Sequence, residues 1–377
     1  MKKLVLGSAI VLLAAACGGG EEKPTTPATT TSATAPASAT APAPSATVEA
    51  PKPKPPLADL MKKTIADIDA AWAAHDAKKL SLAYSDDLQA WGVTPPAGWG
   101  SLTKAQVEQS MTGFFAAFPD GRLTVTRTFT KGNVFVAEGV FTGTNTGEMM
   151  AGDKPSGKKV SVHSAMVSMF NADGLVSQQW TFHDHITMMN QIKGDAKVKT
   201  RALEPIPTAP VVAIVAKDSP DEAKNVDAAK AFYMTFEKKD DKAYLAAMAP
   251  DVALMDYTSA ADLKGIDAAK KNWADMFKIF PDAKMTPKVV LGFDNFVVAA
   301  VEFTGTMKGA LGPIKANNKV ATLHILDIVE MKDGKAKNVW TYGSALEGVI
   351  SLGLMPPPPA AKPATPPPAG TAKPTMK

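Results

Sequence analysis

The middle of the chain shows the same two periodicities in the same order twice. Residues 57–193 begin with apolar residues at helical spacing and continue with segments of alternating apolar and polar residues, and residues 223–354 repeat this order. Helices followed by consecutive strands are typical of an α+β domain whose helices cover one face of a curved sheet. The pattern therefore predicts two tandem, cone-shaped α+β domains, each with three helices packed on a curved antiparallel sheet.

Short motifs in the two halves indicate a duplication. Each half carries the same landmarks in the same order, about 160 residues apart, and the Asp-Gly pairs are typical of hairpin turns. The shared landmarks are Phe-Pro-Asp at 118–120 and 280–282, Phe-Thr-Gly-Thr at 141–144 and 303–306, Asp-Gly at 173–174 and 333–334, and Trp-Thr followed by an aromatic residue at 180–182 and 340–342.

Three segments outside the two copies differ in composition. Residues 17–56 and 355–377 hold nine prolines each and no Phe, Trp or Tyr, so they cannot bury enough apolar surface to offset the entropy of ordering, and we expect both to be disordered. Residues 194–222 contain four prolines and no aromatic residue and are predicted to form the interdomain linker. The apolar run at 211–215 leaves open that part of this linker docks as an extra strand.

Residues 1–16 have the marks of a secretory signal peptide, because Lys2 and Lys3 precede an apolar run that is short for a bilayer span. The run ends in three alanines and Cys17, which resembles a bacterial lipobox. The resemblance implies that Cys17 becomes a lipidated N-terminus and anchors an extracytoplasmic lipoprotein to a bacterial membrane, with the outer membrane, facing the periplasm or the surface, as the expected one. An ordinary signal peptide cut after Ala16 is the alternative. Under either interpretation the protein is exported from the cytoplasm.

Charge and cysteine content exclude several function classes. The formal net charge is +4, but five lysines lie in the signal peptide and the C-terminal tail, so the two predicted domains together are close to neutral. They have no basic run, and we expect no nucleic-acid partner. Once Cys17, the single cysteine, carries lipid, disulfides, cysteine-ligated metals and cysteine nucleophiles are excluded.

Motifs of the first copy, residues 57–193, resemble a SnoaL-like domain of the polyketide-cyclase branch of the nuclear-transport-factor-2-like superfamily. The second copy, residues 223–354, keeps fewer of them and is degenerate. The resemblance implies a cone that encloses an apolar pocket, in a family of cyclases, isomerases, dehydratases and epoxide hydrolases together with members of no known chemistry. The motifs are Phe118-Pro119-Asp120, the run 142–147, the run 155–160, Asp173-Gly174, Trp180 with Asp184, and Gln191; Asn145 stands where the family often has His.

Strand alternation indicates one candidate for acid–base catalysis. A hairpin loop of two or four residues around Gly174 would place His163 opposite or diagonal to Asp184, beside Trp180 and Phe182. A carboxyl group in an apolar pocket has a raised pKa, and a neighbouring imidazole opposes that shift, so such a pair can transfer protons near neutral pH. The family resemblance independently implies that Asp184 is the general acid/base. The alternative is a structural pair.

Aromatic side chains are candidates for contact with a small apolar ligand. Tyr84, Trp91 and Trp99 are placed at the pocket mouth, with Trp180 and Phe182 beside the catalytic candidates; core or lid packing is the alternative. Alternation puts His183 and His185 on one strand face and Asp184 on the other, so we expect no metal site there. The sequence has no phosphate loop or serine-nucleophile motif, and no cofactor is expected.

The second copy is predicted to lack the catalytic pair, since Leu323 and Ser344 align with His163 and Asp184 while His324 falls on the other strand face. We therefore expect a binding or packing module there. Three functions remain: a membrane-tethered lipoprotein that binds a small apolar molecule, an enzyme of cyclase, isomerase or hydratase type that uses Asp184 and His163, and a structural module in which the two copies pair within the chain.

Overall fold

The computed structural model describes residues 54–94, 98–149, 154–194, 199–312 and 314–354. The predicted signal peptide, Cys17, nearly all of the linker up to residue 56, and the tail from residue 355 lie outside the described residues. In the part of the chain that is described, no helix has the length and apolar character needed to cross a bilayer.

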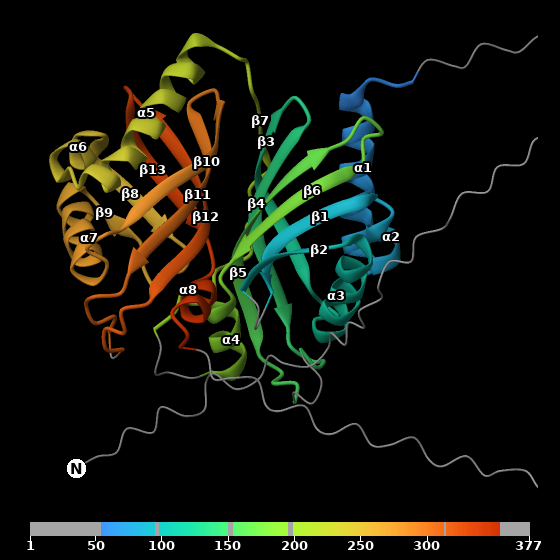
Figure 1. Ribbon diagram of the computed structural model, residues 1–377. Helices are drawn as coiled ribbons and strands as arrows, with labels where there is room; N and C mark the ends of the chain where they lie inside the picture. Colours follow the sequence, from blue (N-terminus) through green and yellow to red (C-terminus); the bar gives the residue numbers. More distant parts are fainter. Residues whose placement is uncertain (1–53, 95–97, 150–153, 195–198, 313, 355–377) are drawn as a thin grey trace, which may run out of the picture.

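The first domain pairs an outer layer of helices with a bent sheet (Figure 1). Three helices precede the strand meander, and a fourth short helix follows it. The elements are α1 (Leu57–Ala73), α2 (Ala77–Ser81), β1 (Tyr84–Thr94), β2 (Gly98–Leu102), α3 (Lys104–Ala117), β3 (Arg122–Lys131), β4 (Val134–Thr144), β5 (Lys159–Phe170), β6 (Val176–His183) and α4 (His185–Lys193).

The second domain repeats this order, and the expected α+β class with two tandem domains is confirmed. It also ends in a short fourth helix. Its elements are α5 (Pro220–Lys238), α6 (Asp241–Ala246), β8 (Met248–Asp256), β9 (Leu263–Lys264), α7 (Ile266–Ile279), β10 (Lys284–Phe293), β11 (Phe296–Thr306), β12 (Val320–Lys332), β13 (Lys335–Tyr342) and α8 (Ala345–Ser351).

Both sheets are mixed, which differs from the expected antiparallel sheets. The strand orders are β2-β1-β6-β5-β4-β3-β7 and β10-β11-β12-β13-β8-β9. The meanders are antiparallel, but β1 runs parallel to β6 and β8 runs parallel to β13. Each of these pairs joins strands that are separated in the chain by a helix and four further strands, so a hairpin does not dictate their direction. The apolar run left open as linker or strand forms β7 (Val212–Val215), parallel to β3.

Local sequence explains where the helices begin and where the sheets bend. Thr103 and Gln106 form a capping box at the start of α3, and the Asp184 carboxylate caps α4 by accepting from the Thr187 N–H at 2.9 Å. A bulge between Val125 and Arg127 interrupts the pairing of β3 with β4 and increases the local twist. Gly139 is required opposite this bulge, because a Cβ there would lie 2.3 Å from the Thr124 carbonyl oxygen.

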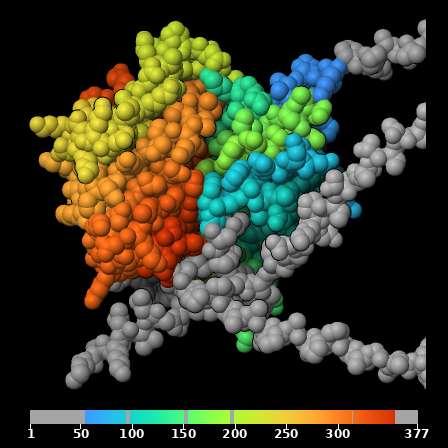
Figure 2. All heavy atoms as spheres, in the orientation of Figure 1, coloured from blue at the N-terminus to red at the C-terminus, as the bar shows by residue number. Residues whose placement is uncertain are grey.

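The two domains contact each other through their sheets, with helices α1–α3 and α5–α7 on the outer sides (Figure 1). Their surfaces meet along a continuous boundary in Figure 2. One apolar cluster contains residues of both domains. From the first domain it includes Phe129, Val136, Ala165 and Phe182, and from the second Phe293, Val298, Leu326, Ile328 and Tyr342. Both faces of each sheet therefore have large buried regions, one against helices and the other against the second sheet.

Candidate functional site

The first domain encloses a cavity of about 370 Å³ between its helices and the inner face of its sheet. Its wall is mostly apolar, and none of the described residues that form it is Asp, Glu, Lys or Arg. The lining residues are Trp72, Leu80, Tyr84, Ala90, Trp91, Gly92, Val93, Leu102, Val107, Ser110, Met111, Phe114, Leu123, Phe141, Met149, Val162, Ser164, Met166, Gln179, Thr181, His183, His185, Met188 and Met189.

Alternation along β5 and β6 brings most of the polar lining groups to the cavity. Ser164 lies on β5, and Gln179 and His183 lie on β6, on the same face of the sheet. The hydroxyl of the buried Tyr84 donates to Gln179 Oε1 at 3.4 Å, and burial raises the pKa of this phenol to about 12. Tyr84 therefore keeps its proton at neutral pH and is a donor in the cavity wall.

Two neighbouring histidines form part of the cavity wall. The rings of His183 and His185 lie 4.1 Å apart, and both line the cavity. Burial lowers the pKa of His183 to about 4, and burial together with the neighbouring His183 ring lowers the pKa of His185 well below its usual value. Both imidazoles are therefore neutral near pH 7, and each carries one N–H donor and one acceptor nitrogen.

The predicted ligand-contacting residues divide between two places. Tyr84 and Trp91 line the cavity, whereas Trp180 and Phe182 pack in the cluster between the two sheets. Trp99 also lies at the domain interface, where its ring stacks on that of His324 with centroids 4.4 Å apart. The placement of Trp99, Trp180 and Phe182 in the pocket is therefore corrected: they contribute to contact between the domains.

The strand register near the predicted catalytic pair is as expected, but the loop and the face are not. The loop has five residues in place of two or four, and a bulge at the end of β5 restores the pairing of odd with even positions. The last pair of β5 with β6 is Ser164 with His183, one step from His163 and Asp184. Both His163 and Asp184 lie on the sheet face toward the second domain. The ring of His163 stacks on Tyr257 with centroids 3.7 Å apart, and burial together with the Arg201 charge lowers its pKa to about 4.

The Asp184 carboxylate is occupied by N–H and O–H donors. Its Oδ2 accepts from the Thr187 backbone N–H at 2.9 Å and from the Thr187 hydroxyl at 2.6 Å, and its Oδ1 accepts from the Ala345 N–H at 2.9 Å. Burial raises its pKa, and these hydrogen bonds oppose that shift. The expectation that Asp184 and His163 meet beside an apolar pocket is corrected, because their strand face is covered by the second sheet.

The strand pairing also corrects the alignment of the two copies. Val140 faces His163 across β4 and β5, and Glu302, at the equivalent position, faces His324 across β11 and β12. His324, not Leu323, is thus the counterpart of His163. The two β-hairpins differ in loop length, so counting back from the final strand shifted the sequence alignment by one residue. Ser344 does stand at the position of Asp184, since each is the N-cap of the last helix.

The second domain has lost five of the polar side chains that line the cavity, although Thr341 and the buried Asp327 stand at the positions of Thr181 and Met166. In the register that aligns the two final strands and helices, an apolar residue or glycine stands at each of five polar positions. Met248 replaces Tyr84, Ile325 replaces Ser164, Val339 replaces Gln179, Gly343 replaces His183, and Ala345 replaces His185.

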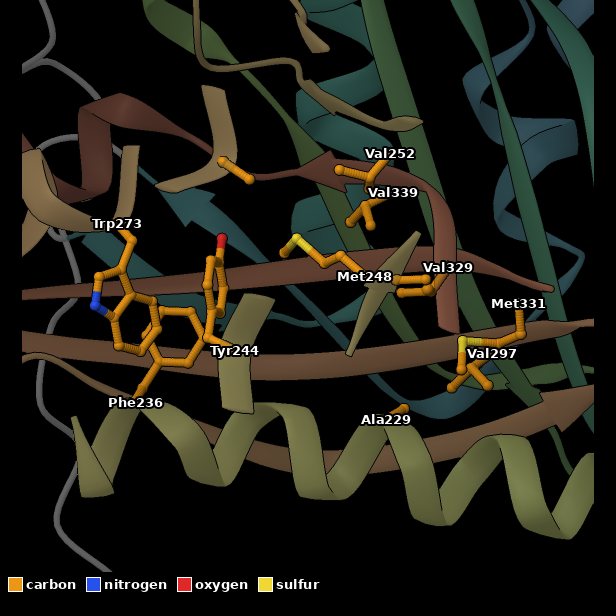
Figure 3. Close-up of a cluster of buried hydrophobic side chains, with 12 residues drawn as sticks. Ala229, Phe236, Tyr244, Met248, Val252, Trp273, Val297, Val329, Met331 and Val339 are labelled. Carbon is orange, nitrogen blue, oxygen red and sulfur yellow. The ribbon is translucent and has the colours of Figure 1, made fainter. Parts of the chain in front are cut away.

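Larger side chains fill the corresponding space of the second domain. Counted from the starts of the equivalent helices, Tyr244 stands at the position of Leu80 and Trp273 at that of Met111. The rings of Tyr244 and Trp273 lie 4.2 Å apart, and Phe236 contacts both (Figure 3). Met248 and Val339 belong to the same buried cluster. The interior that is open in the first domain is therefore packed in the second.

The sequence pattern places His183 and His185 on one side of the chain and Asp184 on the other, and this was the signal that both histidines could line the cavity. In the structure β6 ends at His183, and His185 begins α4. Within the described ranges, no group of three or more His, Cys, Asp or Glu side chains is arranged to hold a metal ion.

A family model described as SnoaL-like polyketide cyclase matches residues 64–192 and again residues 226–347. The chain belongs to this SnoaL-like family. The two matched segments coincide with the two sheet-and-helix domains, and together they span well over half of the chain. No curated protein matches the chain.

Solved structures similar to the SnoaL-like chain each cover about one of its two domains. AclR from Streptomyces galilaeus is 17% identical, with 37% of this chain and 87% of that chain covered and a TM-score of 0.34. TsrD from Streptomyces laurentii is 19% identical, with 36% and 98% covered and a TM-score of 0.32. IdmH from Streptomyces antibioticus is 16% identical, with 34% and 98% covered and a TM-score of 0.32.

Proposed function

We propose that the first domain binds a small, uncharged, largely apolar molecule that carries hydrogen-bonding groups. The observation that carries this proposal is the contrast between the two copies. One copy has an open cavity with several polar groups, and the other has apolar or glycine replacements at five of those positions and aromatic side chains in the space. A cavity of about 370 Å³ lies at the small end of the range for ligand pockets.

The absence of charge favours a neutral ligand. An ion in this cavity would lose its water without meeting an opposite charge among the described lining residues, and that loss costs several kcal/mol. Neutral His183 and His185 offer both a donor and an acceptor to a carbonyl or hydroxyl group. Tyr84 and Gln179 add a second polar position in the same wall.

The test copies the packing of the second domain into the first. The double variant Leu80→Tyr with Met111→Trp introduces the two bulky residues found at the equivalent positions. Binding is measured with Prodan, a neutral naphthyl ketone whose fluorescence shifts in an apolar site. We expect saturable binding to the native chain and at least a tenfold weaker affinity in the double variant, with no loss of thermal stability.

The matched control places the same bulky residues on exposed positions of the same helices, as Lys78→Tyr with Gln109→Trp. The control should bind Prodan as the native chain does. Equal binding by the double variant and the native chain would contradict the proposal, because the probe would then be bound outside the cavity.

Proton transfer to or from a carbonyl substrate is the second candidate, since two neutral imidazoles face the cavity. With a pKa of about 4, His183 is a weak base near pH 7, which favours binding over general-base catalysis. Catalysis by Asp184 with His163 would require both side chains to leave the contacts described above. A search for turnover of carbonyl compounds, with His183→Asn as the comparison, separates the two candidates.

We also propose that the protein is exported and tethered to a bacterial membrane through lipidated Cys17. The support is the sequence at residues 1–20: a charged start, a short apolar run, three alanines, the cysteine and three glycines. We expect the native chain to take up labelled palmitate and to fractionate with membranes, and Cys17→Ser to do neither. A lipid label retained by Cys17→Ser would contradict this proposal.

A further inference from the structure

A side chain of the second domain contacts the wall of the cavity in the first. The hydroxyl of Ser344 lies 3.1 Å from Nδ1 of His185, whose ring lines the cavity of the first domain. Ser344 is buried, with 3% of its surface exposed. The contact therefore lies away from solvent, where a hydrogen bond to a neutral ring has few competitors.

Ser344 is unusual for its position. It is the N-cap residue of α8, where a serine hydroxyl normally accepts from a backbone N–H of its own helix, yet it forms no such bond. The hydroxyl contacts His185 instead. The first N–H of α8, that of Ala345, is bound by Asp184 of the first domain at 2.9 Å.

The residues that precede the two equivalent helices thus each bind the first residue of the other helix. Asp184 caps α4 through Oδ2 and also binds the N–H of Ala345, the first residue of α8, through Oδ1, while the Ser344 hydroxyl binds the ring of His185, the first residue of α4. In Figure 1, α4 and α8 lie side by side below the two sheets. The arrangement fixes the beginning of α4, and with it the place of His185, relative to the second domain.

We infer that the second domain is a positioning unit for the cavity of the first, and that Ser344 holds the ring of His185 in one orientation. The ligand-related part of this inference rests on the proposed binding function. A serine hydroxyl donates to Nδ1 when that nitrogen is unprotonated and accepts from it when it is protonated, so the contact can form in either tautomer. With Nδ1 held by Ser344, the other ring nitrogen keeps one direction relative to the cavity wall.

This inference explains why a degenerate copy is useful. A domain with a packed interior has no ligand site of its own in the space equivalent to the cavity, but it supplies a rigid surface on which a residue of the other domain is oriented. Ser344 acts through His185, so it is a positioning residue.

The experiment uses the full chain and reads the His185 ring directly. Long-range proton–nitrogen NMR spectra at about pH 7 report the hydrogen bonding of each ring nitrogen through its chemical shift. In Ser344→Ala, Nδ1 of His185 loses its hydrogen-bond partner, so the His185 nitrogen shifts should change. Prodan affinity should fall roughly three- to tenfold, the effect of one neutral hydrogen bond.

Two further variants make the result specific. Ser351→Ala removes a hydroxyl from the same helix that bonds only within the second domain, and it should leave the His185 spectrum unchanged. Ser344→Thr keeps a hydroxyl at an extended backbone position and should restore most of the native spectrum.

Unchanged His185 nitrogen shifts in Ser344→Ala would overturn the inference, as would an equal change in Ser351→Ala. If the His185 nitrogen shifts change in Ser344→Ala but the native chain does not bind Prodan, the positioning role stands and the proposed binding function fails. The two claims are thereby tested separately.

Discussion

Arg127 forms the centre of a buried polar cluster between the domains, and its removal should destabilise the chain strongly. Its Nη2 lies 2.6 Å from Glu138 Oε1, and the two side chains are only 11% and 6% exposed. The Tyr342 hydroxyl of the second domain donates to Glu138 Oε2 at 2.7 Å. The guanidinium also lies 4.0 Å from the ring centroid of Trp340, again across the interface.

The variant Arg127→Met leaves the Glu138 carboxylate buried with one remaining partner, Tyr342. Breaking a buried ion pair by removing one member costs about 3–5 kcal/mol of unfolding free energy, because the other charge stays without compensation. The double variant Arg127→Met with Glu138→Gln removes the charge as well. It should recover most of the loss and leave about 1–2 kcal/mol, the size of the lost cation–π contact and hydrogen bond.

The loss of unfolding free energy in Arg127→Met should depend on pH. Burial already raises the pKa of Glu138, and removing Arg127, which lowers it, raises it further. The folded state then holds a proton that the unfolded state releases above its ordinary pKa, so stability falls as pH rises above about 4.5. The cost of Arg127→Met should therefore be full near pH 7 and shrink near pH 5 toward the value of the double variant, about 1–2 kcal/mol, because the charge is then lost in both.

Urea unfolding of the full chain, followed by tryptophan fluorescence at both pH values, measures these differences. Arg122→Met is the control, because Arg122 lies on the same strand but is exposed, and its loss should change stability by less than about 0.5 kcal/mol. A cost below about 1 kcal/mol for Arg127→Met near pH 7, or an equal cost at both pH values, would refute the claim that this pair is shielded between the two sheets.

Two further effects follow from the structure. Because burial lowers the pKa of His183 to about 4, the folded chain binds fewer protons than the unfolded chain below about pH 6.5, and its stability should fall as the pH drops toward 4. His183→Asn should remove about 2–3 kcal/mol of this pH dependence, which thermal melting across the same pH range measures. Gly174 and Gly334 have similar positive φ angles, +74° and +72°, but only at Gly174 would a Cβ meet another atom, at 2.3 Å from Leu60 Cβ. Gly174→Ala should therefore cost about 1–3 kcal/mol more than Gly334→Ala in urea unfolding, and equal costs would show that strain at φ alone decides both.

The sequence alone determined the duplication, the α+β class and the strand faces of the first domain, but it placed His324 of the second domain on the wrong face. Repeated motifs such as Phe-Pro-Asp at 118–120 and 280–282 mark the same positions in both domains, and alternation correctly separated Asp184 from His183 and His185. These features depend on local periodicity and turn chemistry, which short stretches of sequence contain.

Only the tertiary structure decided which strand face encloses the cavity. Alternation of apolar and polar residues identifies the buried face of a strand only when the other face is exposed to solvent. Here apolar side chains lie on both faces, against the helices on one and against the other domain on the other. For this reason His163, Trp180 and Phe182 were predicted in a pocket and lie between the domains instead. The contact of Ser344 with His185 joins residues 159 positions apart, and it depends on the packing of two helices that no local pattern places together.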